Sequence, residues 1–167
     1  MERKENAERL TLEPVASHHA GEMFPVLADP ALYRFTGGEP PGNAASVRRW
    51  FSNLETRKSP DGTESWLTWI VRLNEKNAAI GYVQATIKGM RANTAWLIGT
   101  DWQGHGYAGQ AVALLKSMLT DRGIEQLTAY IHPDHRASQQ VATGAGFIRS
   151  GGSHEGEEIW VASLDPR

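Results

Sequence analysis

The sequence contains no cysteine in its 167 residues. A disulfide, a thiolate nucleophile and a cysteine-based zinc site are therefore excluded. No apolar run is long enough to span a bilayer. The formal net charge is only −2, so no excess of positive charge favours nucleic acid or an anionic membrane. These absences predict a cytoplasmic protein whose partners include neither nucleic acid nor membrane.

The rest of the composition is typical of a globular domain. Hydrophobic residues make up 40% and charged residues 22% of the chain. The length fits one domain with one sizeable core. Residues 1–8 are polar and charged, unlike a signal peptide. We therefore expect a flexible N-terminal tail over residues 1–8 and a single domain over residues 9–167.

Hydrophobic periodicity predicts strands and helices along this domain. The predicted strands are residues 9–15, 64–73, 79–88, 94–99, 125–131, 147–150 and 157–164. Helices are predicted after the capping residues Ser17, Asn43 and Asp134, and from Ala108 to about Arg122. Residues 89–93 are expected to form a loop. Strands that first pair as hairpins and then alternate with helices indicate a mixed sheet of the α/β or α+β class.

One segment between a predicted strand and a predicted helix is rich in glycine. Residues 103–109 read Gln-Gly-His-Gly-Tyr-Ala-Gly. Glycines leave backbone N–H groups unshielded by side chains, and a helix N-terminus favours an anion through its dipole. The segment is therefore suited to holding a phosphate or a pyrophosphate.

The same glycines also match the dinucleotide-binding pattern GxGxxG, at Gly104, Gly106 and Gly109. That pattern normally opens a βαβ unit with further parallel units after it, and an acidic residue ends the next strand. Here His132 and Pro133 follow the next predicted strand, and fewer than sixty residues follow the loop. These features disfavour a Rossmann domain. A glycine-rich turn that only lets strand and helix pack closely remains the structural alternative.

A second element follows about thirty residues later. It reads His-Pro-Asp-His-Arg-Ala-Ser over residues 132–138, with Gly-Ala-Gly-Phe over residues 144–147. In this order and spacing, the two elements resemble the acyl-CoA-binding half of GNAT-superfamily N-acetyltransferases. Gln103, Gly106 and Ala108 fill the superfamily's central motif, and the surrounding residues look like its ribosomal-protein and small-amine branch.

This resemblance implies a fold, a cofactor and a reaction. The fold would be a central mixed, mostly antiparallel sheet of six to seven strands, with about four flanking helices and splayed central strands. Acetyl-CoA would donate an acetyl group to a primary amine of a small molecule or a protein N-terminus, without a metal. A homodimer is compatible with the resemblance. The residues that it assigns to the cofactor are Leu97, Ile98, Gly99, Gln103, Gly104, His105, Gly106, Tyr107, Ala108, Gly109, His135 and Ser138.

The resemblance also suggests catalytic residues. Ser138 would stabilise the departing thiolate. Glu39 is the candidate general base, with Glu64, Gln84 or a water relay as alternatives. Main-chain groups near the end of the strand over residues 94–99 would polarise the thioester carbonyl. The candidate walls of the acceptor pocket are Tyr33, Phe35, Trp50 and Trp69, and for each of them a place in the hydrophobic core is the favoured alternative.

Two residues depart from the family pattern. Gln110 stands where this branch often has glutamate, and His135 replaces the usual asparagine. Together with the lack of a convincing base, they support an alternative function, that of a non-catalytic acyl-CoA-binding or regulatory module. The histidines near residue 132 also invite a metal site, but Pro133 breaks the helical spacing that would align them.

Overall fold

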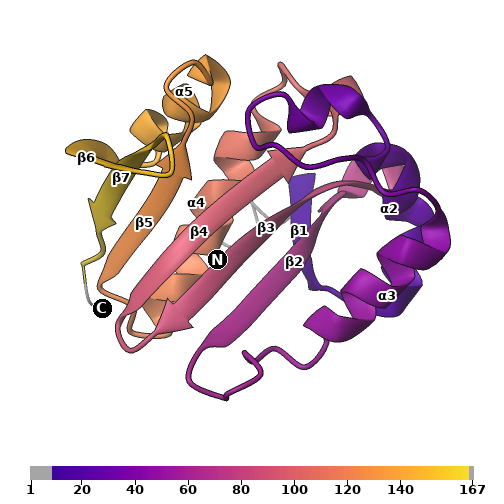
Figure 1. Ribbon diagram of the computed structural model, residues 1–167, viewed down its shortest axis with the longest axis horizontal. Coiled ribbons are helices and arrows are strands. Elements are labelled where there is room, and N and C mark those ends of the chain that lie inside the picture. Colours follow the sequence, from indigo (N-terminus) through magenta and orange to yellow (C-terminus); the bar gives the residue numbers. More distant parts are fainter. Residues whose placement is uncertain (1–8, 166–167) are drawn as a thin grey trace.

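The computed structural model describes residues 9–165, which form one seven-stranded sheet in the order β1-β2-β3-β4-β5-β7-β6 (Figure 1). The strands are β1 Leu10–Pro14, β2 Ser65–Leu73, β3 Ala78–Lys88, β4 Arg91–Ile98, β5 Gln126–Ile131, β6 Ile148–His154 and β7 Glu157–Ser163. The α-helices of this region are α2 Ala20–Leu27, α3 Ala44–Leu54, α4 Tyr107–Asp121 and α5 Arg136–Gly144. Short 3₁₀ helices are η1 Ser17–His19, η2 Pro30–Tyr33, η3 Asn74–Lys76 and η4 Thr100–Trp102.

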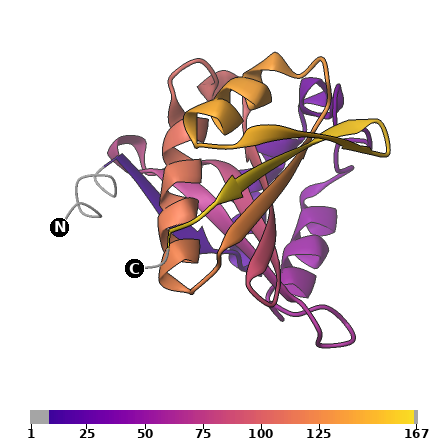
Figure 2. The same ribbon diagram turned by 90° about the vertical axis from the view of Figure 1, so that its left-hand side faces the viewer.

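This architecture confirms the expected fold class. Every strand pair in the described region is antiparallel except β4 and β5, which are parallel. Both faces of the sheet are covered, with α4 on one side and α3 on the other (Figure 2). The flexible tail expected for residues 1–8 lies outside the described residues. No helix in residues 9–165 is long and apolar enough to cross a membrane.

The hydrophobic core lies on the two faces of the sheet. On one face, α4 packs through Leu115 and Leu119 against strand residues that include Trp69. On the other face, α2 and α3 bury Met23 and Phe51. The two clusters fix where each helix crosses the sheet, so they also set the positions of the helix and strand ends that form the site.

Several predicted element boundaries need correction. The side chain of Asn43 accepts the N–H of Ser46, as expected for a helix cap. Ser17 does not cap α2: it begins the 3₁₀ turn η1, and its N–H is bound by Glu55. Asp134 does not cap α5, which begins after His135 and has no side-chain cap. The N–H of Asp134 instead donates to the imidazole of the nearby His132.

The predicted loop over residues 89–93 was also wrong, because β4 begins at Arg91. Lys88 pairs directly with Arg91, so the connection is a two-residue turn. Gly89 has a φ of +62° in the first position of this turn, which glycine adopts easily. The polar residues that suggested a loop are the exposed positions of a strand.

β4 and β5 pair along only a short stretch and then separate. Their parallel register runs from Arg91 opposite Gln126 to Asn93 opposite Thr128. The hydroxyl of Thr94 then donates to the Thr128 carbonyl at 3.1 Å. Beyond this point β4 stays paired with β3, and Figure 1 shows β4 and β5 diverging toward their C-terminal ends. The expected splay of the central strands is therefore present.

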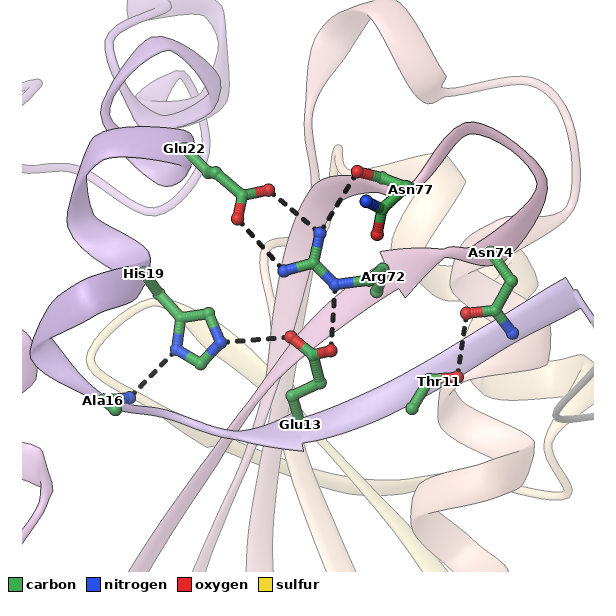
Figure 3. Close-up of polar contacts among 8 residues, drawn as sticks. All are labelled: Thr11, Glu13, Ala16, His19, Glu22, Arg72, Asn74 and Asn77. Atoms are coloured by element: carbon green, nitrogen blue, oxygen red, sulfur yellow. Dashed lines mark hydrogen bonds and ion pairs between the residues drawn. The ribbon is translucent and has the colours of Figure 1, made fainter.

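A polar cluster joins β1, β2 and α2 at one edge of the sheet (Figure 3). Arg72 Nε donates to Glu13 Oε2 at 2.9 Å, and its two terminal nitrogens donate to the two carboxylate oxygens of Glu22 at 2.9 and 3.1 Å. The buried His19 accepts the N–H of Ala16 through Nδ1, so Nε2 carries the proton that it shares with Glu13. Hydrogen bonds from Arg72 lower the pKa of both carboxyl groups.

Replacing Arg72 by methionine removes its ion pairs and is expected to lower the free energy of unfolding by about 1–2 kcal/mol at pH 7. The loss is no larger because both glutamates are partly exposed, so solvent screens their charges. Their pKa values are lowered in the folded state. Their stabilisation is therefore complete above the unfolded pKa of about 4.3 and is lost as the pH falls through the lower folded values. Urea unfolding from pH 7 to pH 3 should give a flatter profile for Arg72→Met than for the original chain. The exposed Arg49→Met is the control, and an equal loss in both variants would contradict the prediction.

Candidate active site

The glycine-rich segment forms an open turn at the start of α4. Gly104 and Gly106 have φ values of +83° and +80°, and Gly106 is the N-cap of this 15-residue helix. No side chain caps the helix, and no acidic residue lies in its first turn. By contrast, Asn43 fills the equivalent position of α3. The first N–H groups of α4 are therefore free of side-chain acceptors and point toward an exposed loop.

This geometry fits a diphosphate. The first main-chain N–H groups of α4 lie where the helix dipole favours negative charge, next to the exposed Gly104 and Gly106. The side chain of Gln103 is turned away, since Nε2 donates to the Ile98 carbonyl at 2.9 Å and ties the loop to the end of β4. Tyr107 is only 8% exposed and anchors the helix in the core, so only its main chain can face a ligand. Gln110 lies beside Gly106, with Nε2 3.9 Å from where a Cβ there would be.

The end of β4 can offer main-chain groups to a ligand in the splay. Gly99 N–H donates to the Ile80 carbonyl at 2.7 Å, so the main chain of Gly99 faces β3. Because main-chain groups alternate along a strand, Leu97 also faces β3, and Ile98 faces the gap beside β5. Of the three residues predicted here, Ile98 is therefore the one whose N–H is directed toward the splay.

Gly81 on β3 makes this arrangement possible. A Cβ at this position would overlap the Leu97 carbonyl oxygen and lie 3.0 Å from the Ile98 Cα. Only glycine lets β4 approach β3 this closely. The position of the last residues of β4, and with it the width of the splay, depends on this missing side chain.

A hollow of about 90 Å³ lies in the splay itself. It is lined by Phe35, Thr36, Thr94, Ala95, Trp96, Ala129, Tyr130, Ile131, His132, His135, Ser138 and Glu157. It brings together the predicted residues His135 and Ser138, whose Nε2 and Oγ atoms are 3.3 Å apart. Phe35, expected in the acceptor pocket, instead stacks on the His135 ring with centroids 4.6 Å apart.

His135 is held in its neutral form. Burial, and to a lesser extent the charge of His132, lower the pKa of His135 below its usual value near 6.5. At neutral pH the imidazole therefore has one N–H and one acceptor nitrogen, like the amide of the asparagine that it replaces in the family pattern. It gains a second N–H only in acid solution.

A second, larger cavity of about 280 Å³ lies between the loop after η2, α3 and β3. Its walls are Leu27, Tyr33, Glu39, Pro41, Ser46, Val47, Trp50 and Tyr82. It contains three of the residues expected near the acceptor, namely Tyr33, Glu39 and Trp50. Trp69 is only 2% exposed and belongs to the opposite face, so it is a core residue and not a pocket wall.

The alternative bases lie elsewhere. Glu64 accepts the indole N–H of Trp66, and Gln84 donates to Thr68. The sequence reasoning missed Tyr82, which is the direct cross-strand partner of Leu97. The alternation of side chains along β3 could have indicated Tyr82, because it places this residue on the face opposite to the core residue Val83.

With this geometry in place, the comparisons with known proteins identify the family. The family model described as "Acetyltransferase (GNAT) domain" matches residues 9–148. The chain therefore belongs to the GNAT acetyltransferase family, as its two motifs indicated. No curated protein sequence gives a significant match.

Solved structures share the fold at low sequence identity. The aminoglycoside acetyltransferase AAC(6')-Ib, in complex with ribostamycin and coenzyme A, is 19% identical with a TM-score of 0.75, and the match covers 93% of both chains. Spermidine N-acetyltransferase from Vibrio cholerae, in complex with CoA and spermine, is 11% identical with a TM-score of 0.76. That match covers 93% of this chain and 96% of the other.

Proposed function

We propose that the chain transfers an acetyl group from acetyl-CoA to a primary amine by direct attack on the thioester. The observation that carries this proposal is the uncapped N-terminus of α4, preceded by two glycines with positive φ. Similar folds solved with coenzyme A and an amine support it. Acetyl-CoA supplies the activated acetyl group, and residues 103–109 hold its diphosphate through their main-chain N–H groups.

The splay between β4 and β5 is the proposed path of the pantetheine arm. It begins beside the glycine-rich loop, and Ile98 N–H faces it. This N–H would donate to the thioester oxygen as negative charge develops there. His135 and Ser138 line the other wall, where His135 can hydrogen-bond the arm and Ser138 the departing sulfur. The 90 Å³ hollow is small for such an arm, so Phe35 would have to move from its position on His135.

The acceptor amine would occupy the 280 Å³ cavity on the other side of β4. Only a neutral amine can attack a carbonyl carbon, so the ammonium form must first lose a proton. Glu39 is the carboxylate on the cavity wall, and it would accept this proton directly or through water. We also propose that this single domain acts in the cytoplasm; a homodimer stays a prediction.

The direct test measures acetyl-CoA binding by calorimetry and thiol release with a panel of primary amines. Transfer predicts both binding and amine-dependent thiol release. Tight binding without turnover for any amine would favour the non-catalytic acyl-CoA-binding module. Absence of binding would contradict both functions.

Ser138→Ala is expected to lower kcat about tenfold with a representative amine, because one hydrogen bond to the thiolate is worth about 1.4 kcal/mol. The dissociation constant for acetyl-CoA should change less than twofold. Single-turnover kinetics separates the chemical step from product release. The exposed Ser163→Ala on β7 is the matched control. An unchanged chemical rate in Ser138→Ala would remove this serine from the mechanism.

A further inference from the structure

The cavity proposed for the acceptor has few polar groups in its wall. Its lining is mostly aromatic and aliphatic, and Glu39 is its one carboxylate. Its volume of about 280 Å³ lies at the lower limit of typical small-molecule pockets, which start near 300 Å³. The cavity therefore suits a compact ligand with a large apolar surface.

The cavity adjoins the proposed position of the thioester. Tyr82, on its wall, pairs across the sheet with Leu97, and both side chains pack in the cluster of α2 and α3. Ile98, whose N–H faces the splay, is the next residue along β4. An amine bound against Tyr82 would thus lie beside the reacting carbonyl, with the rest of the molecule directed toward α3.

Two aromatic rings provide a surface for the part of the ligand that lies beyond its amine. Trp50 and Tyr82 meet edge to face, with centroids 6.0 Å apart and planes at 88°. Such a corner accepts a third aromatic ring in favourable stacked or T-shaped geometry. Trp50 is 37% exposed, so part of its ring is accessible to a ligand in the cavity.

The polar groups of the cavity can satisfy a single ammonium group. The Tyr33 hydroxyl already donates to the Leu27 carbonyl at 2.8 Å. The Tyr82 hydroxyl makes no hydrogen bond within residues 9–165, so its oxygen is available to accept one. Burial and the neighbouring Tyr33 raise the pKa of Tyr82 to about 12, so this hydroxyl stays neutral at physiological pH.

The lining of the cavity offers little negative charge to a polycation. Among the described residues that line it, Glu39 is the one carboxylate. Asp29, the acid just before η2, accepts the Ala31 N–H and is not part of the lining. A ligand with several ammonium groups would therefore find a single carboxylate in the cavity.

We infer that, given the proposed transferase function, the acceptor is an arylalkyl monoamine. Its aromatic body packs against Trp50 and Tyr82, and its nitrogen lies between the Glu39 carboxylate and the Tyr82 hydroxyl. Specificity therefore comes from apolar contact and a single charge. In this respect the site differs from one built for a polyamine or an aminoglycoside.

The test compares 2-phenylethylamine with spermine, ribostamycin and a short peptide bearing a free alanine N-terminus, using the full chain and acetyl-CoA. The value of kcat/KM for 2-phenylethylamine should exceed each of the others at least a hundredfold. A preference for spermine, ribostamycin or the peptide would overturn the inference and leave the transferase function standing. If no amine is acetylated, the transferase function is contradicted. The inference is then tested by calorimetry of amine binding to the full chain. It stands only if 2-phenylethylamine binds more tightly than the other three amines.

Substitutions test the individual contacts. Trp50→Ala should raise KM for 2-phenylethylamine at least tenfold with little change in kcat, because it removes binding surface away from the reacting atoms. Tyr82→Phe keeps the ring and should lower kcat/KM about tenfold. Glu39→Gln should have at least as large an effect, whereas the exposed Glu75→Gln on η3 serves as the matched control. The proposed position of the amine would be overturned if Glu39→Gln and Glu75→Gln gave the same kcat/KM. It would also be overturned if Trp50→Ala left KM for 2-phenylethylamine unchanged.

Discussion

Gly106→Glu should abolish acetyl-CoA binding and leave the fold intact. The substitution places a side chain and a negative charge at the N-cap of α4, where the diphosphate is proposed to lie. Like charges in contact cost several kcal/mol, so affinity measured by calorimetry should fall at least a hundredfold. The space around Gly106 is open, which leaves only the strain of its φ of +80° to affect stability.

Two control variants separate charge from strain. Gly106→Ala has the same backbone strain without the charge, and it should keep acetyl-CoA affinity within about tenfold. Gly151→Glu places the same charge at another open glycine, with φ of +88°, on β6. It should match Gly106→Glu in melting temperature and keep full affinity. A folded Gly106→Glu protein that binds acetyl-CoA normally would remove the diphosphate assignment.

The second large effect is expected at Gly81, which touches no proposed ligand. A methyl group in Gly81→Ala would overlap the Leu97 carbonyl, so β4 must move away from β3. Overpacking of this kind costs about 1–3 kcal/mol of stability. A displacement of about 1 Å in the Ile98 N–H, the proposed oxyanion donor, can lower kcat about a hundredfold. Urea unfolding and steady-state kinetics measure the two effects.

Gly21→Ala is the matched control for this prediction. Gly21 lies in α2, and a Cβ there meets nothing within 4 Å. The change should stabilise the protein by about 0.5–1 kcal/mol, because alanine favours a helix more than glycine does. If Gly81→Ala resembles Gly21→Ala in both stability and kcat, β4 is not held in place by the contact at Gly81.

Much of the fold could be predicted because it depends on local patterns. The alternation in β3, the cap at Asn43 and the glycine after α4 are each determined within a few residues of sequence. The two wrong helix caps, Ser17 and Asp134, lie where short turns precede the α-helices. The main-chain N–H of Ser17 is bound by Glu55, which is far away in sequence, and that of Asp134 by the neighbouring His132. Helical periodicity does not reveal these contacts.

The geometry of the candidate site was predictable to a similar extent. The position of the glycine-rich loop at the start of a helix could be predicted because it depends on contiguous residues, and its role in binding coenzyme A stays a prediction. The cavity proposed for the acceptor could be predicted only in part, since it joins the loop after η2 to α3 and β3. Tyr82 and Phe35 show why: their roles depend on register with Leu97 and on contact with His135, and both partners are far away in sequence.

The loop between η2 and α3 borders both hollows. Phe35 and Thr36 face the splay, Glu39 and Pro41 face the larger cavity, and Gly37 and Gly38 lie between these pairs with positive φ. Glu39 follows Phe35 by only four residues in the same loop. Acetyl-CoA that displaces Phe35 is therefore expected to shift Glu39 as well. Thermodynamic linkage makes this coupling reciprocal: whatever factor the first substrate imposes on the affinity of the second, the second imposes on the first. The two substrates are then expected to bind cooperatively or antagonistically, but not independently.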